Sequence, residues 1–294
     1  MPKLLYYDTA LGVTAFSSTR HGRDSKGKYG EFNINPYCGD EQDAIKNNFT
    51  ALCRELSINE NCFVLPHQVH KTEILIIDKD FMQLDCWQRK KRLEGIDALI
   101  TKEQDICIAV STADCVPILL YSSEYRIAAA VHAGWRGTLN NIAGKTVATM
   151  TGKLGADPNK ISAIIGPSIS QEAFEVGAEV YEQFENKAFD MHEIATHING
   201  KWHIGQRHAT RSAGNKARKY PQGKYMHILK LLRLLFRPQV RNKLRKNRFR
   251  NNFTTTMKTF IKTKHAIALL LIVTAGIPAV LLADSFAPAE KREI

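Results

Sequence analysis

The chain of 294 residues is long enough for one large domain or two ordinary ones, and its 44% hydrophobic content excludes a chain that lacks a core. Its net charge of +12 is unevenly distributed. Residues 1–204 carry 21 Lys and Arg against 26 Asp and Glu, whereas residues 205–294 carry 20 against 3. The first part is therefore slightly acidic, which excludes a uniformly basic nucleic-acid-binding protein, and we expect no nucleic-acid partner.

In chain order, the first 204 residues alternate between short apolar runs and helical periodicity. Apolar runs predict strands at residues 13–16, 62–65, 73–77, 106–111, 118–121, 127–131 and 161–165. Helices are predicted at residues 41–56, after Asp40 as a plausible N-cap, and at residues 139–154 and 178–184. The strands lie close together with few crossover helices. We therefore expect an α+β fold, a single domain of mixed β-sheets flanked by helices, over residues 1–204.

The C-terminal third is aberrant by comparison. Residues 205–256 form a basic segment with no acidic residue and no sustained amphipathic face. Residues 257–294 begin with Met257, continue with lysines and contain an 18-residue uncharged run at 266–283, the layout of a signal peptide or a membrane anchor. Gly276 and Pro278 interrupt this barely sufficient run, and we do not expect a membrane partner. We expect residues 205–294 to remain loosely attached to the core.

The six cysteines indicate the compartment. No Cys-x-x-Cys pair occurs among them, and residues 1–7 lack the long apolar run of a signal peptide. We expect a reducing, cytoplasmic localisation.

Three segments that each follow a predicted strand carry the chemistry. They are LPHQVH (residues 65–70), STADC (111–115) and VHAGWRGT (131–138), and they contain His70, Cys115 and His132. Two imidazoles and a thiolate would suit a catalytic zinc with an open fourth position. The spacing does not exclude three alternatives: a structural His, a buried inert Cys, or a Cys115–His132 nucleophile pair without metal.

These segments occur in the same order as in a known family. Together with TRHG (19–22), GDE (39–41), DALIT (97–101) and GPSIS (166–170), they resemble the laccase-domain family, also called multicopper polyphenol oxidase-like or YfiH-type proteins. The resemblance covers about residues 16–204. It implies a single α+β domain with zinc, or copper, held by His70, Cys115 and His132. It also implies phosphorolysis of purine nucleosides, including adenosine, inosine and methylthioadenosine, with adenosine deaminase activity in several members.

Other residues are candidates for the remaining roles. A nucleoside and phosphate would be the small-molecule partners, and Arg20, His21 and Arg136 are candidates for binding phosphate. Asp114 and His67, together with Arg136, are the candidate catalytic residues, because proton transfer needs a titratable group beside the metal. Gln68 and Glu175 are lesser candidates, with architectural roles expected.

Competing functions remain open at this point. The resemblance also includes copper-dependent phenol oxidation and a hydrolase that edits peptidoglycan precursors. A true multicopper oxidase needs about ten His arranged partly as His-x-His pairs, and none of the ten His here forms such a pair. A non-enzymatic alternative is a protein that binds a membrane or nucleic acid through its basic tail.

The resemblance breaks after Ile204. Family members continue with an Asp and close on Phe-Phe-Ser-x-Arg-Arg and Ser-Gly-Arg, which this chain lacks. Read one base later with suitable codons, LLFRPQVRNKLRKN (residues 234–247) gives Phe-Phe-Ser-Ala-Arg-Arg-Leu-Gly-Ile-Asn-Ser-Gly-Arg-Ile. We interpret this as a frameshift near Gly205. The domain would then lack its closing strand, which would leave an unpaired edge and favour aggregation or a homodimer.

Overall fold

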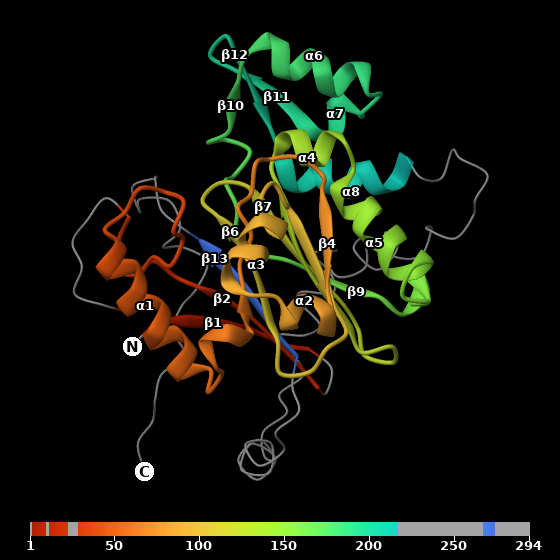
Figure 1. The fold of residues 1–294 in the computed structure, drawn as a ribbon. Helices are drawn as coiled ribbons and strands as arrows, with labels where there is room; N and C mark the ends of the chain where they lie inside the picture. The colour runs from red at the N-terminus through yellow and green to blue at the C-terminus, as the bar shows by residue number, and fades with distance from the viewer. Residues whose placement is uncertain (1, 10–11, 23–28, 217–266, 274–294) are drawn as a thin grey trace, which may run out of the picture.

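The computed structural model describes residues 2–9, 12–22, 29–216 and 267–273 of the chain. These residues form a mixed α+β fold that contains three β-sheets (Figure 1). The strands are β1 (Leu4–Tyr7), β2 (Val13–Ser18), β3 (Phe63–Val64), β4 (Ile74–Ile77), β5 (Ala98–Thr101), β6 (Cys107–Thr112), β7 (Val116–Ser122), β8 (Ile127–Ala133), β9 (Ser162–Ile165), β10 (Glu175–Val176), β11 (Ala195–Ile198), β12 (Lys201–Ile204) and β13 (Ile267–Val273). The helices are α1 (Gln42–Glu55), α2 (Lys79–Gln83), α3 (Cys86–Arg92), α4 (Trp135–Leu139), α5 (Ile142–Gly152), α6 (Ala178–Asn186), α7 (Met191–Ile194) and α8 (Gln206–Lys216), with 3-10 turns at Glu60–Cys62 and Pro158–Lys160.

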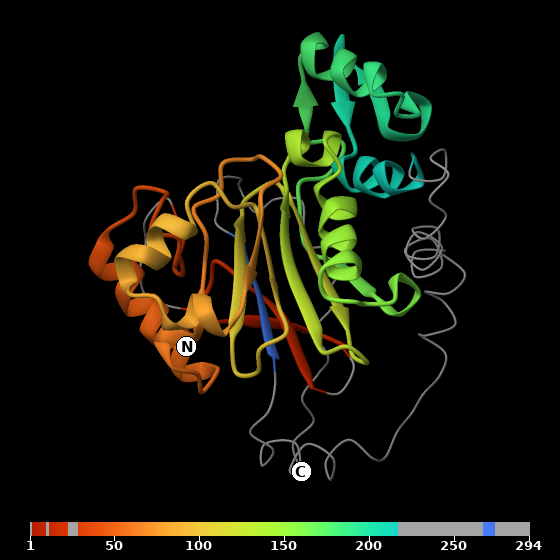
Figure 2. The same ribbon diagram turned by 45° about the vertical axis from the view of Figure 1, so that its right-hand side comes forward.

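Two five-stranded sheets form the body. Their strand orders are β1-β2-β13-β6-β3 and β4-β5-β8-β7-β9. In β6, Ile108 and Val110 face the second sheet, whereas Cys107 and Ala109 face the cluster that includes residues of α1. Each sheet thus buries both faces, which explains why β6 to β8 appear in the sequence as unbroken apolar runs. Helix α1 covers the outer face of the first sheet, and α5 covers that of the second (Figure 2).

A smaller three-stranded sheet, β10-β12-β11, forms a separate lobe with α6 and α7. Its core contains Val180, Phe184, Ile194 and Ile204, and α8 contributes the buried Ala209 and Ala213. Helix α8 also lies against α4, where the hydroxyls of Thr138 and Thr210 are 3.2 Å apart. Thus α8 joins this lobe to the body.

The predicted α+β class is confirmed. All seven predicted strands occur within a few residues of their expected ends, and α1 and α6 occupy the predicted helices. The helix predicted at 139–154 corresponds to α5, which begins only at Ile142, while Leu139 ends the separate helix α4. The later start follows from Asn141, which adopts a left-handed conformation (φ 56°) and caps α5 by accepting from the Gly144 N–H. Strands β1, β5 and β13 and the three strands of the small sheet were not predicted.

The expected loose attachment of residues 205–294 is wrong for the two described parts of that segment. Helix α8 is packed, and β13 lies inside a sheet, where it pairs in parallel with both β2 and β6. The inner edges of β2 and β6 are therefore paired in the described part of the chain, contrary to the expected open edge. Within the described residues, the helices are too short or too polar to span a bilayer. The remainder of the basic segment and of the apolar run lies outside the described residues.

The frameshift near Gly205 remains a prediction about the gene. A Met codon followed by a Lys codon always contains the stop triplet TGA one base later, so the shifted frame ends at Met257 whatever codons are used. We therefore expect resequencing across codon 205 to find one base added or lost. An uninterrupted frame in closely related strains would contradict the prediction, and the packing of α8 and β13 would then reflect a genuine C-terminal segment.

Candidate metal centre

Three side chains from different parts of the chain meet where strands of the two large sheets end. His70 lies in the loop before β4, Cys115 directly precedes β7, and His132 lies near the end of β8. Their potential ligand atoms all lie within 4.8 Å of one another. The two imidazole rings are edge to face, with centroids 4.7 Å apart. Two strand ends and one loop thus bring together the residues that the sequence separates by up to 62 positions.

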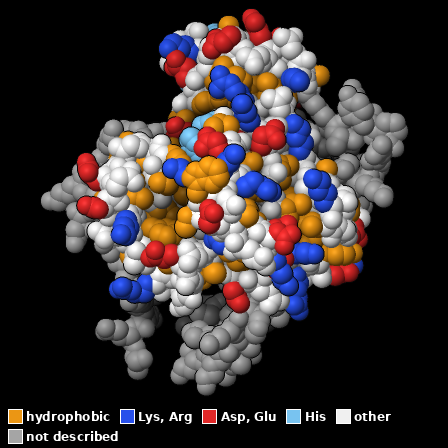
Figure 3. All heavy atoms as spheres, in the orientation of Figure 1, with side chains coloured by type: hydrophobic (Ala, Val, Ile, Leu, Met, Phe, Trp, Pro, Cys, Tyr) orange, Lys and Arg blue, Asp and Glu red, His pale blue; other side chains and the backbone are white. Residues whose placement is uncertain are grey.

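Strand pairing explains why Cys115 and His132 are neighbours. Strands β7 and β8 are antiparallel, with Pro117 opposite His132 and Val116 opposite Ala133. His132 is buried, Cys115 is half-buried and His70 is open to solvent. The site therefore has a closed side formed by the sheet and an open side toward solvent. Histidine side chains are visible at the surface just below the lobe of β10, β11 and β12 (Figure 3).

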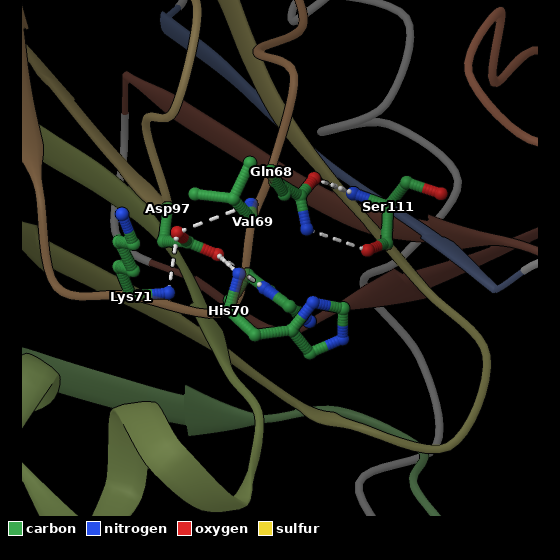
Figure 4. Close-up of polar contacts among 7 residues, drawn as sticks. Gln68, Val69, His70, Lys71, Asp97 and Ser111 are labelled. Carbon is green, nitrogen blue, oxygen red and sulfur yellow. Dashed lines mark hydrogen bonds and ion pairs between the residues drawn. The ribbon is translucent and has the colours of Figure 1, made fainter.

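Asp97 holds two of the three candidate ligands in place. Its carboxylate is fully buried and accepts hydrogen bonds from the backbone N–H groups of Val69 (3.3 Å), His70 (3.0 Å) and Lys71 (2.8 Å) (Figure 4). It also lies 2.7 Å from Nδ1 of His132, so that Nε2 of this imidazole is left for a metal. The Asp97 carbonyl accepts from the His132 N–H as well, at 2.8 Å. Asp97 was not among the predicted site residues, although the DALIT segment, in which an acidic residue directly precedes an apolar run, was a signal for it.

Gly134 leaves room for the site. A Cβ at this position would lie 2.9 Å from Cδ2 of His70 and 3.2 Å from Sγ of Cys115. Both distances are shorter than ordinary van der Waals contact, so any side chain would displace one of these two groups. The glycine of the HAGW segment is therefore part of the site without being a ligand.

The titration behaviour suits a metal site. Burial, together with the nearby carboxylates of Asp114 and Asp97, raises the pKa of the Cys115 thiol to about 11. Partial burial of the ring and the neighbouring His132 lower the pKa of His70, which favours the neutral imidazole that a metal requires. The thiol ionises near neutral pH when a divalent cation binds it. One neutral imidazole, a second imidazole oriented by a carboxylate and a thiol are a donor set that fits zinc, and a His2Cys set is also found with copper.

The other predicted residues lie in different surroundings. Arg136 is exposed on α4, its guanidinium lies over the Trp135 ring at 4.1 Å, and its charge contributes to the lowered pKa of His70. Asp114 is half-buried, and burial raises its pKa. His67 is bound to Glu94 through Nδ1 at 2.8 Å rather than to the three-residue cluster.

Arg20 and His21 contact a different segment. The Arg20 carbonyl accepts from the N–H groups of Glu31 and Phe32, and His21 lies 3.8 Å from the Glu31 carboxylate. Their role in phosphate binding remains a prediction. The expected architectural residues are tied to structure: Gln68 forms two hydrogen bonds to the Ser111 backbone, and Glu175 pairs with Lys201.

Comparisons with known proteins identify the family of the chain. The family model described as multi-copper polyphenol oxidoreductase laccase matches residues 14–217. A purine nucleoside phosphorylase of Bacteroides thetaiotaomicron is 42% identical over 194 residues, covering 65% of this chain and 72% of that protein. Adenosine deaminase RL5, from an unknown prokaryotic organism, is 40% identical over 214 residues and covers 72% and 81%. Among solved structures, YlmD from Geobacillus stearothermophilus matches with a TM-score of 0.64 and 26% identity, over 73% of this chain and 80% of that one.

The proposed metal site can be tested with one ligand variant and a matched pair of glycine variants. We expect close to one zinc per chain in the purified protein, and Cys115→Ala should remove it. Gly134→Ala should also weaken metal retention, because the added methyl group displaces His70 or Cys115. Gly152→Ala is the control, since a Cβ at that position meets nothing within 4 Å. Metal content by mass spectrometry is the measurement, and stoichiometric zinc in Cys115→Ala would contradict the assignment.

The Asp97 prediction concerns stability and pH. Asp97→Asn places an amide N–H against donors of the 69–71 backbone and His132, so we expect a loss of about 3 kcal/mol in the free energy of unfolding at pH 7. Although burial raises the pKa of Asp97, the hydrogen bonds from His132 and Lys71 lower it below the ordinary 3.8. Its stabilisation is therefore present above about pH 3.8 and is lost as the pH falls through the folded value. Urea unfolding without added metal should show the difference from wild type shrinking below that pH.

A second aspartate is the control for this measurement. Asp85 is an exposed N-cap of α3, and Asn is an equally good N-cap, so Asp85→Asn should change stability by only a few tenths of a kcal/mol. A similar loss in both variants would mean that Asp97 has no special structural role.

Proposed function

Because the chain belongs to the multi-copper polyphenol oxidoreductase laccase family, we propose that it is a zinc-dependent purine nucleoside phosphorylase. The observation that carries the proposal is the His70–Cys115–His132 cluster, whose ligand atoms lie within 4.8 Å of one another. The chain that holds it is 42% identical over 194 residues to a relative named purine nucleoside phosphorylase. The substrates would be adenosine, inosine and methylthioadenosine. Adenosine deamination is a further proposed activity, supported by the likeness to adenosine deaminase RL5.

His70, Cys115 and His132 would hold the metal, and a zinc bound by them supplies Lewis-acid chemistry at an open coordination position. His132 keeps its orientation through Asp97, and His70 keeps its place because Asp97 fixes the backbone on both sides of it. Gly134 keeps the space between His70 and Cys115 free of other atoms. The protein's contribution at this point is therefore a preformed donor set that extends from the buried His132 to the exposed His70.

Arg136 is our candidate for holding phosphate. It is exposed, lies near His70, and has no carboxylate partner among the ion pairs of the described residues. A guanidinium binds phosphate oxygens through two parallel hydrogen bonds. In phosphorolysis a phosphate oxygen forms a bond to C1′ of the ribose while the bond from C1′ to the base nitrogen breaks. Arg136 would orient the attacking phosphate for this step.

Asp114 is our candidate for the proton that the departing base requires. Burial raises its pKa, so more of this carboxyl group is protonated at a given pH than for an exposed aspartate. The Asp114 carbonyl accepts from the Ile169 N–H at 3.0 Å, which holds the loop before β7 against the GPSIS segment. The base would leave with the Asp114 proton, and the carboxylate would then be reprotonated from solvent.

The central test is phosphate dependence. We expect release of free adenine or hypoxanthine from adenosine or inosine only when phosphate is present, with ribose 1-phosphate as the second product, measured by chromatography. Arg136→Ala should raise the KM for phosphate about tenfold or more, because a charged hydrogen bond is lost. Lys160→Ala is the control, since Lys160 forms an exposed ion pair with Glu124.

A panel of substrates, assayed with and without phosphate and with zinc or copper, separates the alternative functions. Release of the base at the same rate with and without phosphate would exclude phosphorolysis. Formation of inosine from adenosine would reveal deamination. Oxidation of phenols only after copper loading would support the copper-dependent activity. Cleavage of peptidoglycan precursors would instead support the editing hydrolase.

A further inference from the structure

Beside the metal centre, two aromatic rings form a stack that the proposed mechanism does not use. Tyr37 and His67 are stacked with ring centroids 4.2 Å apart and an interplanar angle of 21°. Nδ1 of His67 lies 2.8 and 2.9 Å from the two carboxylate oxygens of Glu94, which fixes the plane of the imidazole. Both rings remain partly open, with 37% of Tyr37 and 37% of the His67 side chain exposed.

The stack lies close to the metal centre because two chain segments run side by side. His67 forms a parallel bridge with Glu94, and three residues later His70 is bound to Asp97 through its backbone N–H. Three residues of extended chain span at most about 10 Å. The same pair of segments thus presents His67 and Glu94 at one end and His70 and Asp97 at the other.

Ser111 anchors both halves of the stack. Its backbone forms two hydrogen bonds with the side chain of Gln68, at 2.7 and 2.8 Å, and its hydroxyl accepts from Asn35 at 3.2 Å. Asn35 in turn accepts from the Tyr37 N–H at 2.9 Å. The loop of Tyr37 and the segment of His67 are therefore held to one residue of β6. A ligand that stacks here meets rings that are already ordered.

We propose that the Tyr37–His67 stack, fixed by Glu94, is where the purine base of the substrate lies, an inference that rests on the proposed nucleoside activity. A flat purine can extend the stack, and each base–aromatic contact is worth a measurable part of the binding free energy. Stacking depends on the flat face of the purine and hardly on the groups at its edge. The stack therefore accepts adenine and hypoxanthine alike.

Tyr37→Leu is the main variant, with Tyr37→Phe as the conservative one. We expect Tyr37→Leu to raise the KM for both adenosine and inosine about tenfold, with kcat changed less than about twofold, and Tyr37→Phe to keep wild-type values. Glu94→Ala should raise both KM values by a smaller factor, because His67 then loses the acceptor of its Nδ1 hydrogen bond and with it its orientation. Tyr125→Leu is the matched control, since Tyr125 is 38% exposed and lies outside the stack.

Direct binding of free adenine and hypoxanthine, by calorimetry on the purified full-length protein, separates this inference from the proposed function. About tenfold weaker binding of both bases to Tyr37→Leu, but not to Tyr125→Leu, supports the stack even if no phosphorolysis is found. Wild-type base affinity and KM in Tyr37→Leu would overturn it even if phosphorolysis is confirmed. If Tyr37→Leu weakens the binding of only one of the two bases, the proposal that both bases bind on the same stack is wrong.

Discussion

The buried carboxylate of Asp97 is the interaction on which the candidate site depends. It accepts three consecutive backbone N–H groups of the His70 loop and orients His132 from the neighbouring strand. A carboxylate without exposure to solvent is strongly destabilising unless its oxygens are fully hydrogen-bonded, and here they are. The arrangement ties a loop to a sheet at one point. Because the loop and the strand carry two of the three candidate ligands, the same bonds that stabilise the fold also set the metal geometry.

The pairing of the core strands fixes the positions of these residues. Strand β8 is buried on both faces and lies between β5 and β7, so His132 at its end has no freedom to shift along the sheet. Asp97 precedes β5, which pairs with β8, and Cys115 precedes β7, the other neighbour of β8. The ends of three adjacent strands thus place Asp97, His132 and Cys115 at the same end of the sheet. This order explains how residues in separate sequence segments converge without a long loop between them.

Much of the body could be predicted from the sequence because its strands are buried on both faces and appear as apolar runs. The three candidate ligands were identified from motifs, but Asp97, Glu94 and Tyr37 were not, since their roles arise from contacts between segments that spacing does not reveal. The apolar run at 266–283 was recognised in the sequence, but its structure could not be predicted. Its composition suits a membrane segment or a buried strand equally well. The described part, β13, is a strand because β2 and β6 offer two parallel edges, a feature that only the tertiary structure contains.

The backbone at His70 links this stability argument to function. His70 has φ 61°, a left-handed conformation that costs a non-glycine residue roughly 1–2 kcal/mol. Hydrogen bonds to a charged group contribute roughly 1.5–3 kcal/mol each, so the three N–H bonds to Asp97 offset this strain with a margin. A glycine would adopt the same conformation without strain, but it would carry no imidazole. At His70 the strained backbone is thus kept where the chain must turn and a candidate ligand must still face Cys115 and His132.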